Sequence, residues 1–256
     1  MGVAGGEVIV TALTHRGAVR SANEDAVVMG ALTVAGANMT SPVRCILPIS
    51  EPVILAVADG IGGQAAGEIA SEHAVHRLAE TGPRLDGPTK IAQLLSNIDE
   101  EIKDHAQQHT EFSGMGTTVA GLLLKDDRNY WFNVGDSRTY RLEEQPRQRL
   151  IQLSEDDAPV LPPSEDGRPV TTNFITQSLG GSSGGGMEPH VDVDEAPDPS
   201  TWLMCSDGLS DLVLPDEMER ILAKAGSDEA AVHALWQAAM EAGGKDNISI
   251  LLARRS

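Results

Sequence analysis

"VILAVADGIGGQAAGEIA", residues 53–70, is the stretch of the sequence that says most about the fold. Six apolar residues lead into Asp59-Gly60, and two further glycines separate this pair from a segment with helical spacing. A short apolar run bounded by glycines is typical of a buried strand. The stretch therefore predicts a strand, a sharp turn that carries a carboxylate, and a helix.

The turn after this strand allows two functional interpretations. Residues 60–65, "GIGGQA", fit the loose G-x-G-x-x-G/A pattern of dinucleotide-binding loops, in which glycines let backbone N–H groups approach a pyrophosphate. In the other interpretation Asp59 is the main feature, and the glycines let the chain turn sharply around a bound cation. A single glycine pattern is weak evidence, so the choice depends on the rest of the chain.

The composition of the chain argues against partners that carry many negative charges. The 256 residues include 38 Asp and Glu but only 19 Lys and Arg, which gives a formal net charge of −19. Nucleic acids and anionic membranes are bound by clustered basic residues, and the sequence contains no such cluster. We therefore expect no nucleic-acid partner and no membrane partner. The length and the 41% hydrophobic content predict a single domain over residues 1–256.

The cysteines and the N-terminal sequence indicate a reducing compartment. Cys45 and Cys205 are too few for a disulfide framework. The N-terminal residues lack the basic and apolar segments of a secretory signal, and the longest apolar stretches are far shorter than a membrane span. We expect a cytoplasmic, monomeric protein.

Strands and helices are predicted in separate groups along the chain. Apolar and β-branched runs predict strands over 7–14, 25–35 and 52–58, and helical spacing predicts helices over 64–80 and 89–109. The runs "TTVAGLLLK", "YWFNV" and "RTYRLEE", separated by the turn sequences "DDRN" and "GDS", predict an antiparallel meander. The remaining predictions are strands in "PHVDVDEA" and "STWLMCS", helices in "PDEMERILAKAG" and "DEAAVHALWQAAMEAGG", and a final strand in "NISILLARR".

This grouping indicates an α+β fold with antiparallel sheets covered by helices, and not a doubly wound parallel sheet. A dinucleotide-binding unit needs a second parallel strand after its helix, with an acidic residue at the strand end. Glu80 lies at about the right distance along the chain, but Gly82-Pro83 and another helix follow it. The order of elements therefore disfavours the dinucleotide-binding interpretation of residues 60–65.

A flap is predicted between residues 154 and 186. Residues 155–170 contain four prolines and show no periodicity, and residues 180–186 include five glycines. Long segments of this kind are typical of surface loops that carry function.

Further acidic residues lie where predicted strands begin or end. The strand-then-Asp-Gly arrangement occurs twice, at Asp59-Gly60 and at Asp207-Gly208. Asp246 lies immediately before the last predicted strand, and Asp136 is expected at the tip of a hairpin. Each of them is on its own an ordinary turn residue. Because a buried carboxylate is costly without a compensating cation or hydrogen-bond donors, their joint occurrence favours a cation site.

The segment "RGAVRSANEDA", residues 16–26, places an arginine close to two carboxylates. Arg20, Glu24 and Asp25 lie within six residues. One interpretation is a polar turn before a strand. In the other, the planar arginine fork binds a phosphoryl group and the carboxylates hold metal-bound water.

Six motifs cover nearly the whole chain in this order: "GAVRSANEDA", "VADGIGG", "GMGTTVAGLL", "NVGDSRTYRL", "CSDGLSD" and "GGKDNISILL". Together they resemble the metal-dependent PP2C-type (PPM) serine/threonine protein phosphatases, in their bacterial form. The resemblance implies a central β-sandwich of two antiparallel sheets that is flanked by helices on both sides. It places the active site at one end of the sandwich, where the strand-end carboxylates converge.

The resemblance also implies a site for two Mn²⁺ or Mg²⁺ ions and a weaker third ion. Oxygen ligands and retained waters suit these hard divalent cations. By this resemblance Asp59 would bridge the two main ions, Asp207 and Asp246 would complete the shell of one of them, and the carbonyl of Gly60 would bind the other. Asp136 would hold the third ion together with Asp207 and Asp211. Glu24 and Asp25 would act on metal-bound waters.

The implied reaction is the hydrolysis of phosphoserine and phosphothreonine in proteins by a hydroxide that bridges the metals, without a covalent phosphoenzyme. Arg20 would bind the phosphoryl group, and the implied substrates are phosphorylated proteins, in opposition to a bacterial Ser/Thr kinase. Neither cysteine is followed by the arginine of a C-x₅-R loop, which disfavours a cysteine phosphatase. A pseudophosphatase, which would bind a phosphorylated partner without cleaving it, is the main alternative, and the complete set of carboxylates disfavours it.

The sequence departs from the family's pattern beside Asp59 and at the flap. Ile61 stands where many eukaryotic members have a histidine thought to protonate the leaving group, so that role has no carrier at this position. "DDA", residues 156–158, stands where the family commonly has Asp-His-Ser, and Gln177 stands where an arginine is usual. The general acid and the handling of the substrate near the flap therefore stay open.

Two pairs of residues have less specific predicted roles. Thr117 and Thr118 are expected to be strand residues whose hydroxyls support the site. His105 and His109 lie one helical turn apart and could bind zinc, but no third ligand is near them in the sequence. A solvated helix face is the favoured interpretation of the two histidines.

Overall fold

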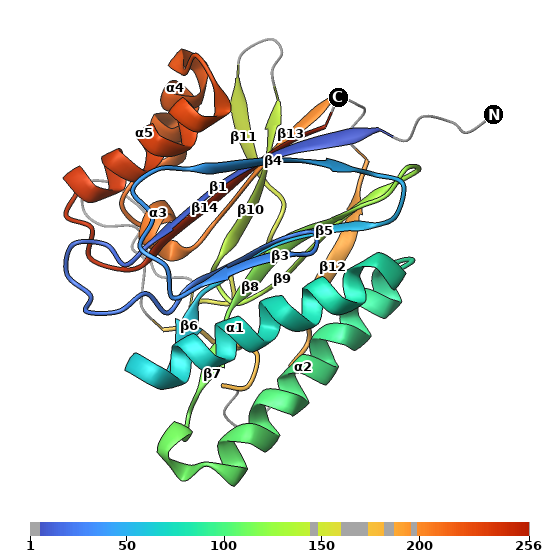
Figure 1. Cartoon of the computed structure of the whole chain (residues 1–256), viewed down its shortest axis with the longest axis vertical. Coiled ribbons are helices and arrows are strands. Elements are labelled where there is room, and N and C mark those ends of the chain that lie inside the picture. Colours follow the sequence, from blue (N-terminus) through green and yellow to red (C-terminus); the bar gives the residue numbers. More distant parts are fainter. Residues whose placement is uncertain (1–5, 144–147, 160–173, 182–186, 196–198, 256) are drawn as a thin grey trace.

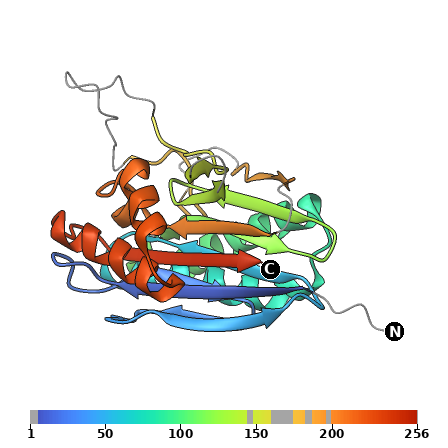
Figure 2. The same cartoon turned by 90° about the horizontal axis from the view of Figure 1, so that it is seen from above.

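Two six-stranded antiparallel sheets lie face to face in the computed structural model, which describes residues 6–143, 148–159, 174–181, 187–195 and 199–255 (Figure 1). The first sheet contains, in spatial order, β11 (Arg149–Gln152), β10 (Arg138–Glu143), β13 (Ser200–Cys205), β14 (Ile248–Arg255), β1 (Glu7–His15) and β4 (Val43–Pro48). The second sheet contains β12 (His190–Asp194), β9 (Asn129–Val134), β8 (Val119–Leu124), β5 (Val53–Ala58), β2 (Ala26–Met29) and β3 (Leu32–Ala35). Figure 2 shows the strands of the first sheet side by side in this order. The predicted β-sandwich is confirmed.

Helices cover the outer face of each sheet, which completes the predicted layering of helices, two sheets and helices (Figure 1). α1 (Gln64–Thr81) and α2 (Pro88–Gln108) pack on the second sheet, and α4 (Pro215–Lys224) and α5 (Asp228–Glu241) pack on the first. The shorter elements are α3 (Asp207–Ser210), η1 (Gly82–Arg84), η2 (Thr110–Phe112) and the paired strands β6 (Gly60–Ile61) and β7 (Gly116–Thr117).

Strand β5 explains why the apolar run before Asp59 contains no polar residue. All six residues of β5 are buried inside the second sheet. Alternate residues face opposite layers: Ile54, Ala56 and Ala58 belong to the core beneath α1 and α2, and Val53, Leu55 and Val57 belong to the core between the sheets. A strand that is covered on both faces has no solvated side for a polar residue. Asp59 is therefore the first position at which a polar side chain is tolerated.

Most of the predicted elements are confirmed close to their predicted bounds. The strand predicted over 25–35 is instead the hairpin of β2 and β3, and Gly30, with φ of 62°, lets the chain reverse between them. The strands β4 and β11 were not predicted from the sequence. Both are edge strands of the first sheet, so they lack the fully apolar pattern of a central strand.

The predicted meander is wrong at its second turn. β8 and β9 form a hairpin, but β10 pairs with β11 and β13 in the other sheet. The "GDS" sequence, residues 135–137, therefore carries the chain from the second sheet to the first. Asp136 lies in this crossover and not at the tip of a hairpin.

The flap predicted over 154–186 is only partly covered by the structure. Residues 160–173 and 182–186 lie outside the described residues. In the parts that the structure does describe, 154–159 and 174–181, the chain forms no helix or strand apart from an isolated bridge between Leu179 and Thr117.

Candidate active site

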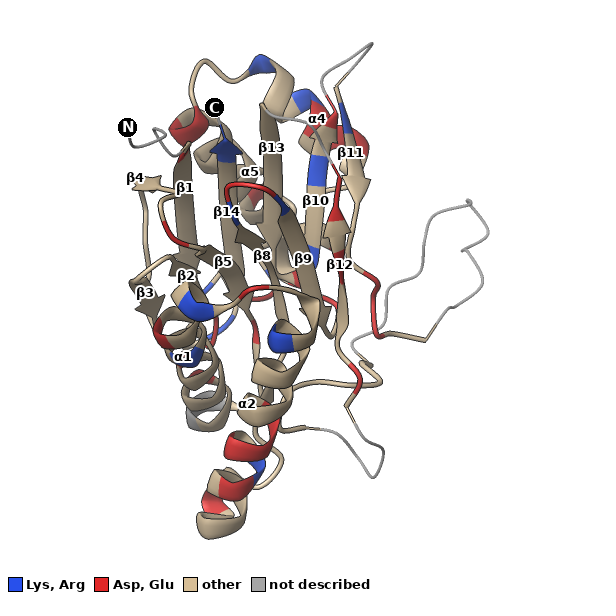
Figure 3. Cartoon of the chain, turned by 90° about the vertical axis from the view of Figure 1, so that its right-hand side faces the viewer, with Lys and Arg blue, Asp and Glu red and all other residues tan. Residues whose placement is uncertain are grey.

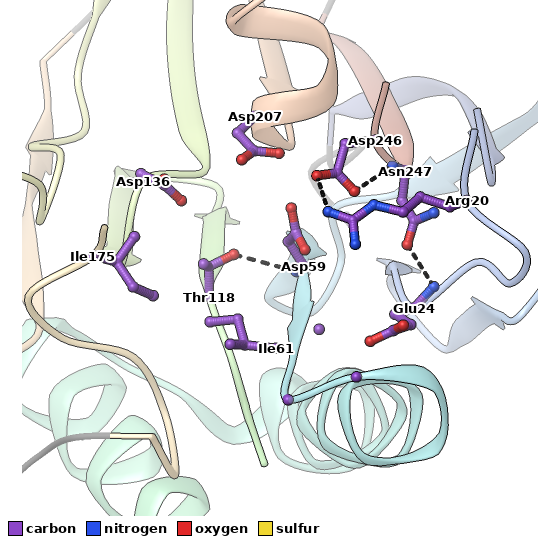
Figure 4. Close-up of a pocket in the computed structure, with 13 residues that line it drawn as sticks. Arg20, Glu24, Asp59, Ile61, Thr118, Asp136, Ile175, Asp207, Asp246 and Asn247 are labelled. Carbon is purple, nitrogen blue, oxygen red and sulfur yellow. Dashed lines mark hydrogen bonds and ion pairs between the residues drawn. The ribbon is translucent and has the colours of Figure 1, made fainter. Parts of the chain in front are cut away.

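A cavity of about 200 Å³ opens at the end of the sandwich where β5, β9 and β13 end and β14 begins. Four aspartates predicted from the sequence line it: Asp59, Asp136, Asp207 and Asp246 (Figure 4). The other lining residues include Arg20, Glu24, Gly60, Ile61, Thr118, Ile175 and Asn247. The structure thus brings together residues from both sheets and from the loop between β1 and β2, residues 16–25, which is called the N-terminal loop below.

Each of the four carboxylates is placed by the end of a strand. Asp59 directly follows β5, and Asp207 is the first residue of α3, two positions after β13. Asp246 precedes β14 by two residues, and Asp136 lies in the crossover between β9 and β10. In Figure 4 the carboxylates of Asp59, Asp207 and Asp246 surround one space, with Asp136 on its far side.

Hydroxyl groups of the neighbouring strand fix the backbone of Asp59. The N–H of Asp59 donates to Thr118 Oγ1 (3.2 Å), and its carbonyl accepts from Thr117 Oγ1 (2.9 Å) and from the N–H of Thr118 (2.9 Å). Thr118 Oγ1 is in turn 2.7 Å from Ser137 Oγ, in the crossover that carries Asp136. These contacts agree with the supporting role predicted for the two hydroxyls, but only Thr117 is a strand residue, because Thr118 lies between β7 and β8.

The glycine after Asp59 is required by close packing. A Cβ atom at Gly60 would clash with the backbone carbonyl oxygens of Gly67 in α1 and of Glu24 in the N-terminal loop. Gly60 therefore lets α1 and the loop of Glu24 approach the end of β5, and its place in the chain is explained without a nucleotide.

Asn247 holds the N-terminal loop against β14. The N–H of Glu24 donates to Asn247 Oδ1 (2.7 Å), and Asn247 Nδ2 donates to the carbonyl oxygens of Arg16 (3.1 Å) and Ala22 (2.9 Å). Reasoning from the sequence missed this residue, although its position beside Asp246 in "GGKDN" was a usable signal. The clamp brings Arg20 and Glu24 to the cavity.

Arg20 is already paired with one of the predicted metal ligands. Its Nη2 donates to Asp246 Oδ2 at 2.6 Å, and the two side chains are 51% and 31% exposed. This hydrogen bond is the main reason that the pKa of Arg20 is raised. The sequence did not predict the pair, because the two residues are 226 positions apart.

The carboxylates of the cavity repel one another. Burial raises the pKa of Asp59 well above its usual range, and the charges of Asp25 and Asp207 raise it further. Burial also raises the pKa of Asp207 to about 8 and that of Asp136 to about 6. Such shifts mark a site with more negative charge than the protein compensates.

The donor set fits a divalent cation. Asp207 Oδ1 is buried, and the described residues give it no hydrogen-bond partner. A buried carboxylate oxygen without a donor is unfavourable, and a bound cation compensates it. In the described part of the chain no three His, Cys, Asp or Glu side chains are gathered as a ready-made metal cluster, so the carboxylates line a shared cavity instead. The fit is therefore one of charge and of oxygen donors, the ligands that Mn²⁺ and Mg²⁺ prefer.

Two of the predicted site residues lie outside the wall of the cavity. Asp25 is fully buried behind it, where Oδ2 accepts a hydrogen bond of 2.9 Å from Ser206 Oγ, and burial raises its pKa to about 7. Asp211 is exposed at the C-terminal cap of α3, and its charge contributes to the raised pKa of Asp136. Asp211 therefore acts on the cavity from its periphery.

His105 lies in the last turn of α2 and His109 is the C-terminal cap of this helix, and neither lines the cavity in the described part of the chain. The ring centroids of His105 and His109 are 4.7 Å apart, and the ring of Phe112 stacks on His105 at 5.7 Å. Within the described residues these contacts give the two histidines a packing role at the end of α2.

Comparison with known proteins gives a consistent result. A family model described as "Protein phosphatase 2C" matches residues 49–247. The chain is 31% identical over 253 residues to serine/threonine protein phosphatase PstP of Mycobacterium tuberculosis. The aligned region covers 94% of this chain and 44% of PstP. It thus spans less than half the length of PstP. Serine/threonine phosphatase stp of Listeria monocytogenes is 32% identical over 225 residues, which cover 80% of this chain and 85% of that protein.

Solved structures support the same relationship. The crystal structure of the M. tuberculosis phosphatase PstP/Ppp matches with a TM-score of 0.76 and 30% identity, over 96% of this chain and 98% of that one. The catalytic domain of PstP in complex with two manganese ions matches with the same TM-score and identity, over 97% of this chain and 99% of that one. The chain described here belongs to the protein phosphatase 2C family.

Proposed function

We propose that this chain is a metal-dependent protein serine/threonine phosphatase and that residues 1–256 form its catalytic domain. The observation that carries the proposal is the gathering of Asp59, Asp207, Asp246 and Arg20 around one cavity, in a chain of this family. The relatives that it resembles along most of its length are named as serine/threonine phosphatases. An intact set of acidic residues disfavours a pseudophosphatase.

The acidic residues of the cavity would hold the metal ions. Asp59, Asp207, Asp246 and the carbonyl of Gly60 would hold two Mn²⁺ or Mg²⁺ ions, and Asp136 would hold a third together with Asp207. Asp211, which is exposed, would contribute mainly through its charge. When bound, the ions supply Lewis-acid activation of the attacking water and of the phosphoryl group. The structure of a relative in complex with two manganese ions supports this choice of metal.

The remaining polar residues of the cavity orient the reactants. Arg20 carries five N–H donors, of which Nη2 donates to Asp246, so the fork has donors left for phosphoryl oxygens. Glu24 lines the cavity with its backbone fixed by Asn247, so its carboxylate is placed to accept a hydrogen bond from the attacking water. Asp25 acts from behind the wall, where Ser206 orients its carboxylate. Ile61 has no proton to give, so this side chain does not protonate the leaving oxygen.

The proposed substrates are proteins phosphorylated on serine or threonine, in opposition to a bacterial Ser/Thr kinase. We place the enzyme in the cytoplasm as a monomer, without nucleic-acid or membrane partners. Lys and Arg are scattered over several elements in the view of Figure 3, whereas Asp and Glu gather along α2. None of the helices in the described residues combines the length and the apolar character needed to cross a bilayer.

The proposal is tested by the release of phosphate from a phosphothreonine peptide with and without Mn²⁺. Wild-type protein is expected to turn over only with the metal, and EDTA is expected to abolish the activity reversibly. Asp246→Asn should be inactive, whereas Asp192→Asn, which changes an exposed acid on β12, should behave as wild type. Binding of the peptide without turnover would favour the pseudophosphatase, and activity that is indifferent to metal would contradict the proposal.

A further inference from the structure

The crossover that carries Asp136 is held by three consecutive residues from outside the cavity. Asn133 Nδ2 donates to the carbonyl of Glu155 (2.6 Å), and the N–H of Glu155 donates back to Asn133 Oδ1 (3.1 Å). Arg138 binds Asp156 through Nε (3.1 Å to Oδ1) and Nη2 (2.6 Å to Oδ2). Residues before and after Asp136 are therefore tied to the same short segment.

The third residue of this segment, Asp157, holds the peptide next to Asp136 from both sides. The N–H of Gly135 donates to Asp157 Oδ2 at 2.8 Å, and the carbonyl of Gly135 accepts from the N–H of Asp157 at 3.0 Å. Gly135 has φ of 98°, a conformation that only glycine adopts without strain, and it directly precedes Asp136. The carboxylate of Asp157 supplies the contact to the N–H of Gly135, whereas the Gly135 carbonyl is held by the backbone of Asp157 and by Asn133 Nδ2 (3.3 Å). The contact next to Asp136 that depends on the Asp157 side chain is therefore the one to the N–H of Gly135.

The other carboxylate oxygen of Asp157 is held by residues from two more segments. Gln177 Nε2 donates to Asp157 Oδ1 at 2.6 Å, and His190 Nε2 lies 2.9 Å from the same oxygen. The backbone of Glu188 fixes the amide of Gln177, because it accepts from Nε2 (3.1 Å) and donates to Oε1 (3.0 Å). The N–H of Thr176 donates to the carbonyl of Asp157 at 2.7 Å. Asp157 is thus a hub that joins the crossover, residues 176–177 and β12.

Asp157 is buried, with only 9% of its side chain exposed. It is not one of the residues that line the cavity in the described part of the chain. A buried carboxylate requires several donors, and here the donors come from Gly135, Gln177 and His190. Asp157 and Gln177 are also positions at which the sequence departs from the family's pattern, and the structure shows that they contact each other.

We propose that Asp157 is a positioning residue, which orients Asp136 toward the metal site through the peptide of Gly135. The inference rests on the proposed function only in that Asp136 is taken as a metal ligand. Residues that orient ligands from outside the coordination shell commonly change metal affinity by about 10–100-fold when they are replaced. The expected signature is a weaker metal site at Asp136 without a change at the site built on Asp59.

The variants for the test are Asp157→Asn and Asp157→Ala. Asn keeps the shape of the side chain but has only one acceptor oxygen, and the amide of Gln177 cannot turn because Glu188 fixes it. In Asp157→Asn the new NH₂ group must therefore face another donor, either the N–H of Gly135 or Nε2 of Gln177. Asp192→Asn on β12 removes an equal charge from an exposed position and is the matched control.

Two measurements on the whole chain read the positioning role directly. Hydrogen–deuterium exchange of the metal-free protein should be faster at residues 133–138 in both Asp157 variants, and unchanged in β8. Calorimetric titration with Mn²⁺ should show the weakest binding step about tenfold weaker, with the tighter steps unchanged. Asp136→Asn should remove the same step, and Asp192→Asn should match wild type in both measurements.

Wild-type exchange and wild-type Mn²⁺ binding in both Asp157 variants would overturn the inference. Faster exchange throughout the second sheet, with all Mn²⁺ steps weakened together, would also overturn it, because that result describes a general structural role. If Asp157→Ala fails to fold, Asp157→Asn decides. Neither measurement uses turnover, so a protein without phosphatase activity would refute the proposed function and leave this test intact.

Discussion

Replacement of Arg20 separates its contact with Asp246 from its predicted role on the substrate. The guanidinium donates to Asp246 at 2.6 Å, but the two side chains are 51% and 31% exposed. Exposed ion pairs contribute about 0–1 kcal/mol to stability. Arg20→Ala should therefore lower the melting temperature by no more than about 4 °C, given the usual relation between free energy and melting temperature for a chain of this size.

The effect on catalysis should be much larger than the effect on stability. A hydrogen bond to a charged group is worth about 1.5–3 kcal/mol, and loss of such a contact to the phosphoryl group corresponds to a fall of about 10–150-fold in kcat/KM. We expect the loss mainly as a raised KM, because Arg20 binds the phosphoryl group in the ground state as well as in the transition state. Arg20→Lys should recover only part of the loss, since an ammonium group cannot form two parallel hydrogen bonds.

The assay is steady-state hydrolysis of one phosphothreonine peptide by wild type, Arg20→Ala, Arg20→Lys and the control Arg84→Ala. Arg84 lies in η1, away from the cavity, so its replacement controls for the loss of a positive charge. Mn²⁺ binding should not weaken in Arg20→Ala, because the arginine competes with the cation for Asp246. Wild-type kinetics in both Arg20 variants would refute the reasoning and reduce Arg20 to a surface residue.

Three further replacements test other parts of the site. Asp207→Asn should lower kcat at least about 100-fold, because it removes a carboxylate from the site that activates the attacking water. In the EDTA-treated protein at a pH above the raised pKa of Asp207, which is about 8, the same replacement should raise the melting temperature by removing a repelled, buried charge; a lower melting temperature there would contradict the repulsion. Asn247→Ala removes three hydrogen bonds to the N-terminal loop and should lower the free energy of unfolding, measured in urea, by about 2–3 kcal/mol, at about 1 kcal/mol for each bond. A decrease below about 1 kcal/mol would show that these bonds contribute little to holding the loop. Gly60→Ala should destabilise by about 1–3 kcal/mol through its clash with Gly67 and Glu24, and unchanged stability in the same assay would argue against that packing.

The central strands and the carboxylates at their ends were predictable from the sequence. The run before Asp59 is apolar because both faces of β5 are covered, and this burial leaves a local pattern that can be recognised. Asp207 and Asp246 were found for the same reason, since each lies next to a buried strand.

The path between the sheets was not predictable from local pattern. The turn sequence "GDS" suits a hairpin and a crossover equally, so only the pairing of β10 with β13 decides where Asp136 lies. The edge strands β4 and β11 are partly exposed, which weakens the apolar pattern that marks a strand. The pairs Arg20–Asp246 and Gly135–Asp157 depend on contacts between distant segments, which no single segment encodes.

The most direct test of the central claim is a titration of two EDTA-treated proteins, wild type and Asp59→Asn, with Mn²⁺. Calorimetry measures the binding of the ions, and the release of phosphate from a phosphothreonine peptide measures the activity at each Mn²⁺ concentration. Asp59 is the carboxylate assigned to two ions, and its pKa is raised by burial and by its acidic neighbours. The account predicts that wild type binds at least two Mn²⁺ ions and gains activity as they bind, whereas Asp59→Asn loses both the tight binding and the turnover. Turnover by the metal-free wild type, or wild-type binding and turnover in Asp59→Asn, would contradict it.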